Sequence, residues 1–175
     1  MLKTKHCMLS ALFFLTLGCG NKQGQSDNVN ILIENAFNLK GQRVTSIDSV
    51  TSNNTNKMCR IIFLFNYYDC SSCIDLGFSI TNKIDSLYKK KIVTVISTMG
   101  NPTFYQKRNA YHEYVYSDSE DLIRKELKYV PTPILILLDS SNYIKDYILP
   151  GSSSNKETVS FIKEITGTKM LKLHK

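Results

Sequence analysis

The stretch of sequence that decides the fold is residues 60–73, which read RIIFLFNYYDCSSC. The run from Arg60 to Phe65, which is apolar throughout after its first residue, predicts a strand buried on both faces at the centre of a sheet. From residue 71 to residue 90 the apolar side chains recur at steps of three and four, which predicts a helix. Cys70 and Cys73 therefore stand where a buried strand passes into a helix.

Two cysteines separated by two residues have a defined chemistry at such a junction. The free N–H groups and the positive dipole end of a helix N-terminus favour a thiolate, and they lower the pKa of a cysteine there. We predict that Cys70 is the nucleophile, which attacks a substrate disulfide and forms a mixed disulfide. Cys73, one helical turn further on, is within reach to resolve it.

Strands and helices alternate along the rest of the chain. Apolar runs predict strands at residues 92–96, 113–116, 134–138 and 143–149, the last two joined as a hairpin. Helical spacing predicts helices at residues 102–109 and 119–127, and a final helix that a Ser154–Glu157 capping box opens and Gly167 ends. Residues 31–33 and 38–50 predict short strands and turns. The alternation predicts an α/β fold with crossover connections, a largely parallel sheet and an antiparallel edge.

Three features of residues 60–139 together resemble a known family. They are the strand 61–65 running into Cys70-Ser71-Ser72-Cys73, the run Tyr116-Ser117-Asp118 before a helix, and Thr132-Pro133 before a strand that ends at Asp139. The chain resembles the thioredoxin superfamily, and more closely its TlpA-like, membrane-anchored periplasmic thiol–disulfide oxidoreductase branch. The resemblance implies a thioredoxin-like fold, with a central mixed β-sheet flanked by helices. It also implies a redox-active Cys70–Cys73 disulfide, protein dithiol or disulfide substrates, a redox partner protein and no cofactor.

The family keeps a cis-proline beside the active-site cysteines, and the residue before it offers backbone hydrogen bonds to the substrate chain. By the spacing to Asp139, the resemblance assigns these substrate-binding roles to Pro133 and Thr132. Pro131 is the alternative, because Pro131-Thr132 also looks like the Pro-Thr of thioredoxin.

The chain departs from the family around the motif. Asp69 stands where relatives commonly have Trp, and its negative charge is expected to oppose a thiolate at Cys70. No acid in residues 60–65 matches the buried proton acceptor of thioredoxin. A non-catalytic thioredoxin-like lipoprotein, acting as a binding module or a metal chaperone, is therefore the alternative function. No metal site is predicted, because His112 is isolated from the cysteines in sequence.

The first residues predict export. Lys3 and Lys5 precede a short apolar run, and residues 1–18 together have the form of a signal peptide. The run ends in LTLGC at residues 15–19, which resembles a bacterial lipobox with Cys19 as the lipidated residue. An ordinary signal peptide with an incidental Cys19 is the alternative. Residues 19–30 predict a flexible tether and residues 31–175 the thioredoxin-like domain, which places the domain outside the cytoplasm, lipid-anchored in the bacterial cell envelope.

The composition is that of a globular protein, with 42% hydrophobic and 21% charged residues. The formal net charge is +7, of which two positive charges belong to residues 1–18. The basic residues form no stripe with interleaved aromatic side chains, so the sequence does not favour binding to nucleic acid.

Overall fold

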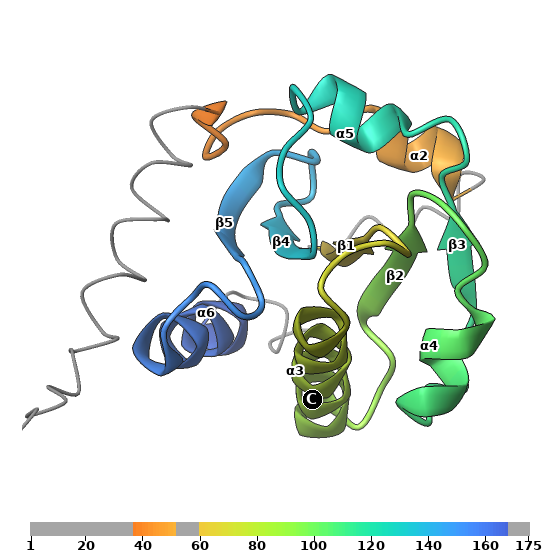
Figure 1. The fold of residues 1–175 in the computed structure, drawn as a ribbon. Coiled ribbons are helices and arrows are strands. Elements are labelled where there is room, and N and C mark those ends of the chain that lie inside the picture. Colours follow the sequence, from red (N-terminus) through yellow and green to blue (C-terminus); the bar gives the residue numbers. More distant parts are fainter. Residues whose placement is uncertain (1–36, 52–59, 168–175) are drawn as a thin grey trace, which may run out of the picture.

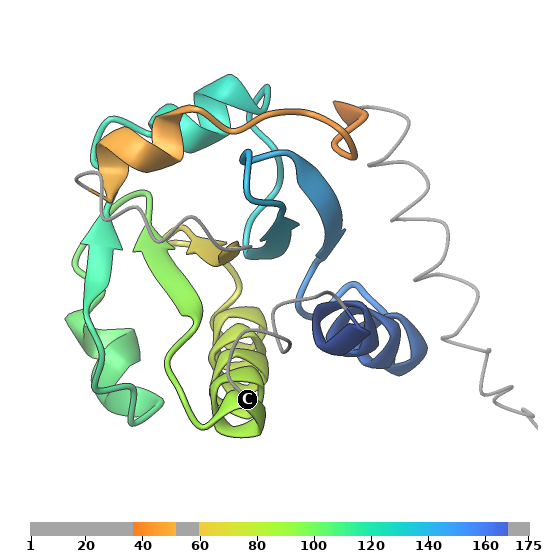
Figure 2. The same ribbon diagram turned by 180° about the vertical axis from the view of Figure 1, so that it is seen from behind.

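The computed structural model describes residues 37–51 and 60–167, which form a five-stranded sheet with helices on both faces (Figure 1 and Figure 2). The strands are β1 (Arg60–Phe65), β2 (Val93–Ser97), β3 (Val115–Ser117), β4 (Ile134–Leu138) and β5 (Ile144–Ile148). Their order across the sheet is β3-β2-β1-β4-β5. The apolar runs predicted β1 and β4 with these same bounds, and the other strands within two residues at each end.

The sheet is mixed, and this corrects the expectation of a largely parallel sheet. β1 pairs in parallel with β2, and β2 with β3, whereas β4 runs antiparallel to both β1 and β5. The connection from β3 to β4 contains the short helix α5 (Leu122–Glu126). Since β4 is antiparallel to β1 and β3 runs in the direction of β1, the chain re-enters the sheet from the end at which β3 leaves it.

The other helices of the described residues are α2 (Ser46–Val50), α3 (Ser71–Tyr88), α4 (Thr103–Arg108) and α6 (Asn155–Gly167). The capping box before α6 is confirmed, because Ser154 N–H donates to Glu157 Oε2 at 2.6 Å and Glu157 N–H donates to Ser154 Oγ at 3.2 Å. Within the described residues, no helix has both the length and the apolar character needed to cross a membrane.

β1 buries its side chains alternately in two separate cores. Ile61, Phe63 and Phe65 pack with side chains of α3 and α6, whereas Ile62 and Leu64 pack with side chains of α2 and α5. Figure 1 shows α2 and α5 above the sheet, and α3 and α6 below it. None of the five side chains is exposed, and each burial stabilises the fold by about 1.5–3 kcal/mol. Burial on both faces is the reason that this run is continuously apolar.

Residues 38–50 depart from the short strands and turns that the sequence predicts, because they include the helix α2. Glu126, at the end of α5, holds the start of this helix. Its carboxylate oxygens accept hydrogen bonds from the N–H groups and hydroxyls of Thr45 and Ser46, at 2.6–2.9 Å. The first N–H groups of a helix need such acceptors. This acceptor lies 80 residues away in sequence, so a local pattern could not reveal it.

Asp118 connects β3 to α5. Its Oδ1 accepts the N–H of Leu122 and its Oδ2 accepts the N–H of Ile123, both at 2.9 Å, and the residue is buried. The helix was predicted from residue 119 but begins at Leu122, because Asp121 adopts the left-handed conformation with a φ of 56°.

We predict that Glu126→Ala lowers the free energy of unfolding by about 2 kcal/mol, because the first N–H groups of α2 lose their acceptors. Burial acts to raise the pKa of Glu126, but the hydrogen bonds from Ser46 and Thr45 outweigh it and hold the pKa below its ordinary value. The stabilisation is therefore present above the ordinary Glu pKa and is lost as the pH falls through the lowered pKa of the folded state. Urea unfolding at neutral and at acid pH measures both effects.

Glu120→Ala is the matched control, because it removes an exposed carboxylate from the same segment. Its unfolding free energy should stay within about 0.5 kcal/mol of the wild type. An equal loss in the two variants, or a Glu126→Ala effect that stays constant at acid pH, would contradict the capping role.

Candidate functional site

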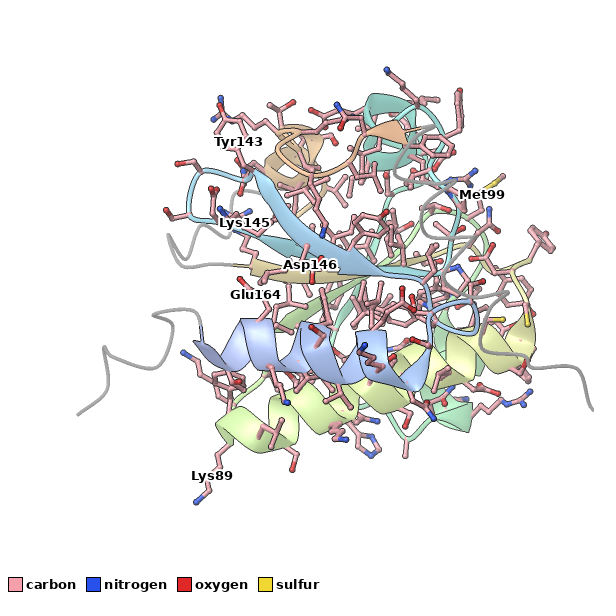
Figure 3. The ribbon with its side chains drawn as sticks, turned by 90° about the vertical axis from the view of Figure 1, so that its left-hand side faces the viewer. Lys89, Met99, Tyr143, Lys145, Asp146 and Glu164 are labelled. Atoms are coloured by element: carbon pink, nitrogen blue, oxygen red, sulfur yellow. The ribbon has the colours of Figure 1, made fainter. Side chains whose placement is uncertain are left out.

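Cys70 and Cys73 occupy the start of α3, directly after the turn that leaves β1. The carbonyl of Cys70 accepts hydrogen bonds from the N–H groups of Cys73 at 3.0 Å and Ile74 at 2.9 Å. In Figure 3, Met99 lies at this end of the molecule and Lys89 lies at the opposite end of α3. The positive end of an 18-residue helix is thus directed at the two sulfur atoms, as the sequence predicts.

The two cysteines are free thiols in different surroundings, with Cys70 exposed and Cys73 partly buried. A hydrogen bond with the Cys73 thiol lowers the pKa of Cys70, and so does Ser72, whose Oγ lies 3.2 Å from Cys70 Sγ. Burial raises the pKa of Cys73 to about 11, and the hydrogen bond and charge of Cys70 act in the same direction. Of the two thiols, Cys70 therefore loses its proton more readily than Cys73.

Asp69 closes the turn between β1 and α3. Asn66 N–H donates to Asp69 Oδ2 at 2.8 Å, and Asp69 N–H donates to the carbonyl of Asn66 at 3.0 Å. The other oxygen, Oδ1, accepts the hydroxyl of Thr132 at 3.0 Å. We expected the charge of Asp69 to oppose a thiolate at Cys70. Hydrogen bonds with Cys73 and Ser72 nevertheless lower the pKa of Cys70, and the charge of Asp69 contributes to the raised pKa of Cys73.

The Thr132-Pro133 peptide bond is cis, which decides between Pro131 and Pro133 in favour of the latter. Pro133 is buried, whereas Pro131 is exposed. The first residue of β4 pairs with Leu64, so the residues before β4 lie beside those that follow β1. The structure therefore brings all four predicted site residues in the domain, Cys70, Cys73, Thr132 and Pro133, to one end of the sheet.

Gly151 belongs to the site as well, a role that the sequence did not indicate. A Cβ atom placed on Gly151 would lie 2.6 Å from Cys73 Sγ and 3.3 Å from Cys73 Cβ. Its φ of 87° also lies in the left-handed region that favours glycine. The backbone of the loop after β5 therefore covers the Cys73 thiol, and no larger residue fits there without a shift. A Pro-Gly pair signals a turn, but it gives no sign of which side chain the turn contacts.

Two further residues that the sequence did not indicate attach α4 to the first turn of α3. Arg108 donates from Nη1 to Ser71 Oγ at 3.1 Å, and its Nη2 pairs with Asp75 Oδ2 at 2.7 Å. Asn109 Nδ2 donates to Asp75 Oδ1 at 2.9 Å. Ser71 and Asp75 are four residues apart and therefore share one face of α3. This spacing is the one local feature of the sequence that is consistent with a shared contact to Arg108. The Arg108 guanidinium thus lies beside Ser71, the residue that follows Cys70.

An apolar rim, formed by Tyr68, Met99 and Phe104, is exposed near the motif. Tyr68 is 78% exposed, Phe104 53% and Met99 49%. Ring contacts connect Tyr68 to Tyr67 (centroids 5.3 Å apart), Tyr67 to Tyr105 (5.5 Å) and Tyr105 to Phe104 (5.1 Å). Tyr67 N–H donates to the carbonyl of Met99 at 3.3 Å. Large apolar side chains left exposed together are suited to contact with a partner.

Within residues 37–51 and 60–167, no group of three or more histidine, cysteine or acidic side chains is arranged to hold a metal ion. His112 is exposed. Several predictions lie outside the described residues: the signal peptide 1–18, lipidation of Cys19, the tether 19–30 and the strand 31–33.

No protein-family model matches the sequence, and no curated protein matches it. Solved structures match it in fold. The chain is similar to a candidate protein disulfide isomerase from Bacteroides thetaiotaomicron, with a TM-score of 0.53 and 14% identity over 66% of this chain and 75% of the other. A candidate thiol:disulfide interchange protein from Chlorobium tepidum has a TM-score of 0.49 and 15% identity, over 63% of this chain and 79% of the other.

The thioredoxin domain of a thiol-disulfide oxidoreductase from Bacteroides vulgatus has a TM-score of 0.48 and 15% identity, over 62% of this chain and 79% of the other. The match to the Bacteroides thetaiotaomicron structure and the strand order β3-β2-β1-β4-β5 support the same fold. The chain has a thioredoxin-like fold, with a central mixed β-sheet flanked by helices, and this prediction is confirmed.

We predict that Gly151→Ala destabilises the reduced protein more than Gly41→Ala does. The two glycines have similar positive φ angles, 87° and 83°, so each substitution costs about 1–2 kcal/mol of backbone strain. A Cβ on Gly41 meets no atom within 4 Å, whereas a Cβ on Gly151 meets the sulfur of Cys73. Urea unfolding of both variants in the presence of dithiothreitol measures the difference.

The excess cost of Gly151→Ala should shrink when Cys73→Ala removes the sulfur atom from the same chain. If the two glycine substitutions cost the same, or if the excess persists in full without the sulfur, then Gly151 does not pack on the thiol.

Proposed function

We propose that the protein is a thiol–disulfide oxidoreductase of the TlpA-like branch of the thioredoxin superfamily, acting on exported proteins. The observation that carries this proposal is the unequal pair of thiols at the start of α3. Cys70 is exposed with a lowered pKa, and Cys73 is partly buried with a raised pKa. A thiolate is the species that attacks disulfides, so Cys70 reacts first. The thioredoxin-like fold supports this chemistry, and so does the likeness to a candidate protein disulfide isomerase.

The reaction begins when the Cys70 thiolate attacks one sulfur of a substrate disulfide. The substrate S–S bond breaks, a disulfide forms between Cys70 and the substrate, and the released substrate thiolate takes up a proton. Cys73 then loses its proton and attacks Cys70 Sγ, which forms the Cys70–Cys73 disulfide and releases the second substrate sulfur as a thiol. The substrate gains two electrons from the two cysteines. It also gains two protons, one from Cys73 and one from solvent, which received a proton when the Cys70 thiolate formed. A dithiol of a redox partner protein reduces the pair again, and the same steps in reverse oxidise a substrate dithiol.

The substrate chain is proposed to bind beside Thr132 and Pro133. The backbone N–H and C=O of Thr132 make no hydrogen bond to any of the described residues. Such free groups can pair with an extended peptide as a strand does. The exposed apolar rim would contact the apolar side chains of that peptide.

We further propose that the protein is a lipoprotein of the bacterial cell envelope, with its domain outside the cytoplasm. The support is the sequence of residues 1–19, with its basic start, its short apolar run and Cys19 at the end of the LTLGC motif. Several acyl chains on Cys19 would hold the protein stably at a membrane. Disulfides form and persist outside the cytoplasm, so substrates for a cysteine pair are present there.

We predict that Cys70→Ser abolishes the reduction of insulin disulfides by dithiothreitol above the uncatalysed rate. Cys73→Ser should instead accumulate a mixed disulfide with insulin, because the attack by Cys70 proceeds and its resolution does not. Non-reducing gels and mass spectrometry detect this species. Cys59→Ser, a cysteine outside the motif, is the control and should keep wild-type turnover. Full turnover by Cys70→Ser, or a wild-type protein that does not turn over, would contradict the oxidoreductase.

The exposed apolar rim favours a second candidate, a lipoprotein that uses its thioredoxin-like body to bind a partner without catalysis. The two candidates differ in cells that carry the double variant Cys70→Ser and Cys73→Ser. Retention of the full cellular function by this variant would favour the binding module, whereas its loss would favour the oxidoreductase.

We predict that cells expressing the full chain incorporate labelled palmitate into this protein and that Cys19→Ala removes the label. The reason is that the lipid is attached to the side chain and amino group of the residue after the cleavage point. Cys7→Ala, which lies in the predicted signal peptide, is the control and should keep the label. A wild-type protein without label would overturn the lipid anchor and leave export through an ordinary signal peptide.

A further inference from the structure

The Asp69 carboxylate connects two segments that are far apart in the sequence. Its Oδ2 accepts the N–H of Asn66 at 2.8 Å, which closes a local turn. Its Oδ1 accepts the hydroxyl of Thr132 at 3.0 Å, across a separation of 63 residues. Asp69 directly precedes Cys70, and Thr132 directly precedes the cis-proline. One side chain therefore connects the nucleophile's segment to the segment proposed to bind the substrate.

The sheet does not fix the distance between these two segments by itself. The pairing of β1 with β4 ends at Leu64 and Ile134, and both segments lie beyond this last pair. Past the end of a ladder, the positions of two chains depend on contacts between side chains and turns. The hydrogen bond between Thr132 and Asp69 is the polar contact that the structure shows between them.

The contact is suited to hold its partners firmly. Asp69 and Thr132 are both partly buried, and the acceptor is a carboxylate, which makes hydrogen bonds stronger than those between neutral groups. Turn formation explains the bond to Asn66, but it does not require a partner for Oδ1. The bond to Thr132 is therefore not part of the turn. It orients Thr132, whose backbone N–H and C=O are free among the described residues.

We propose that Asp69 is a positioning residue that holds the Thr132 backbone at the place beside Cys70 where an extended substrate segment pairs with it. This inference rests on the proposed oxidoreductase function. Asp69 does not touch the reacting sulfur atoms in this role. It acts through Thr132, and its loss should weaken the binding of a protein substrate far more than the attack by Cys70.

The test is a double-variant cycle of Asp69→Ala and Thr132→Val, with kcat and KM measured for insulin and dithiothreitol as the reductant. Each single variant should raise KM roughly tenfold with little change in kcat, since a Thr132 backbone that is no longer held must be ordered when the substrate binds. The double variant should be no worse than the more impaired single variant, because each single variant already removes the hydrogen bond between Asp69 and Thr132. Thr132→Ser, which keeps the hydroxyl, should restore most of the affinity.

Asp139→Ala is the matched control, because Asp139 accepts two backbone N–H groups in the turn between β4 and β5. It should leave KM unchanged. Wild-type KM in Asp69→Ala, or effects that multiply in the double variant, would overturn the positioning role. If Asp69→Ala does not fold, the comparison of Thr132→Val with Thr132→Ser still decides, since equal KM values in these two variants overturn it. A wild-type protein without turnover is a different result, which overturns the proposed function.

Discussion

Ile61, Phe63 and Phe65 enter one core of the protein while Ile62 and Leu64 enter the other, so β1 is held from both sides. A slip of one residue in its pairing would move each of these side chains into the opposite core, and burial therefore specifies the register with β2 and β4 strongly. The same register determines where β1 ends. The turn at residues 66–69, the helix start at Cys70 and the segment before β4 all take their places from that end.

The two cysteines acquire different chemistry from this arrangement, although they are identical residues one helical turn apart. Cys70 precedes the helix, lies open to solvent and receives hydrogen bonds that favour its thiolate. Cys73 lies within the first turn, under the backbone of Gly151, where burial disfavours a charge. The difference comes from neighbours within the motif and from the loop after β5. In the proposed exchange reaction, it places attack by Cys70 before resolution by Cys73.

The direction of β4 has a comparable effect on the site. Because β4 runs antiparallel to β1, it starts at the end of the sheet where β1 finishes. Thr132 and Pro133 thus lie near Cys70 as a result of topology, and Asp69 adds a hydrogen bond across the remaining space.

The sequence by itself determined the parts of this protein that depend on local spacing. These are the strand–helix order from residue 60 onward, the Cys70–Cys73 pair at a helix start and the capping box at Ser154, because each leaves a pattern within a few residues. The tertiary structure alone decided the helix at Ser46–Val50, the antiparallel direction of β4, the cover of Cys73 by Gly151 and the bond from Thr132 to Asp69. In each of these the partner lies outside the local segment, as Glu126 lies 80 residues from Ser46. Such partners come into contact when the sheet and both cores have formed, so the local spacing of residues does not predict these contacts.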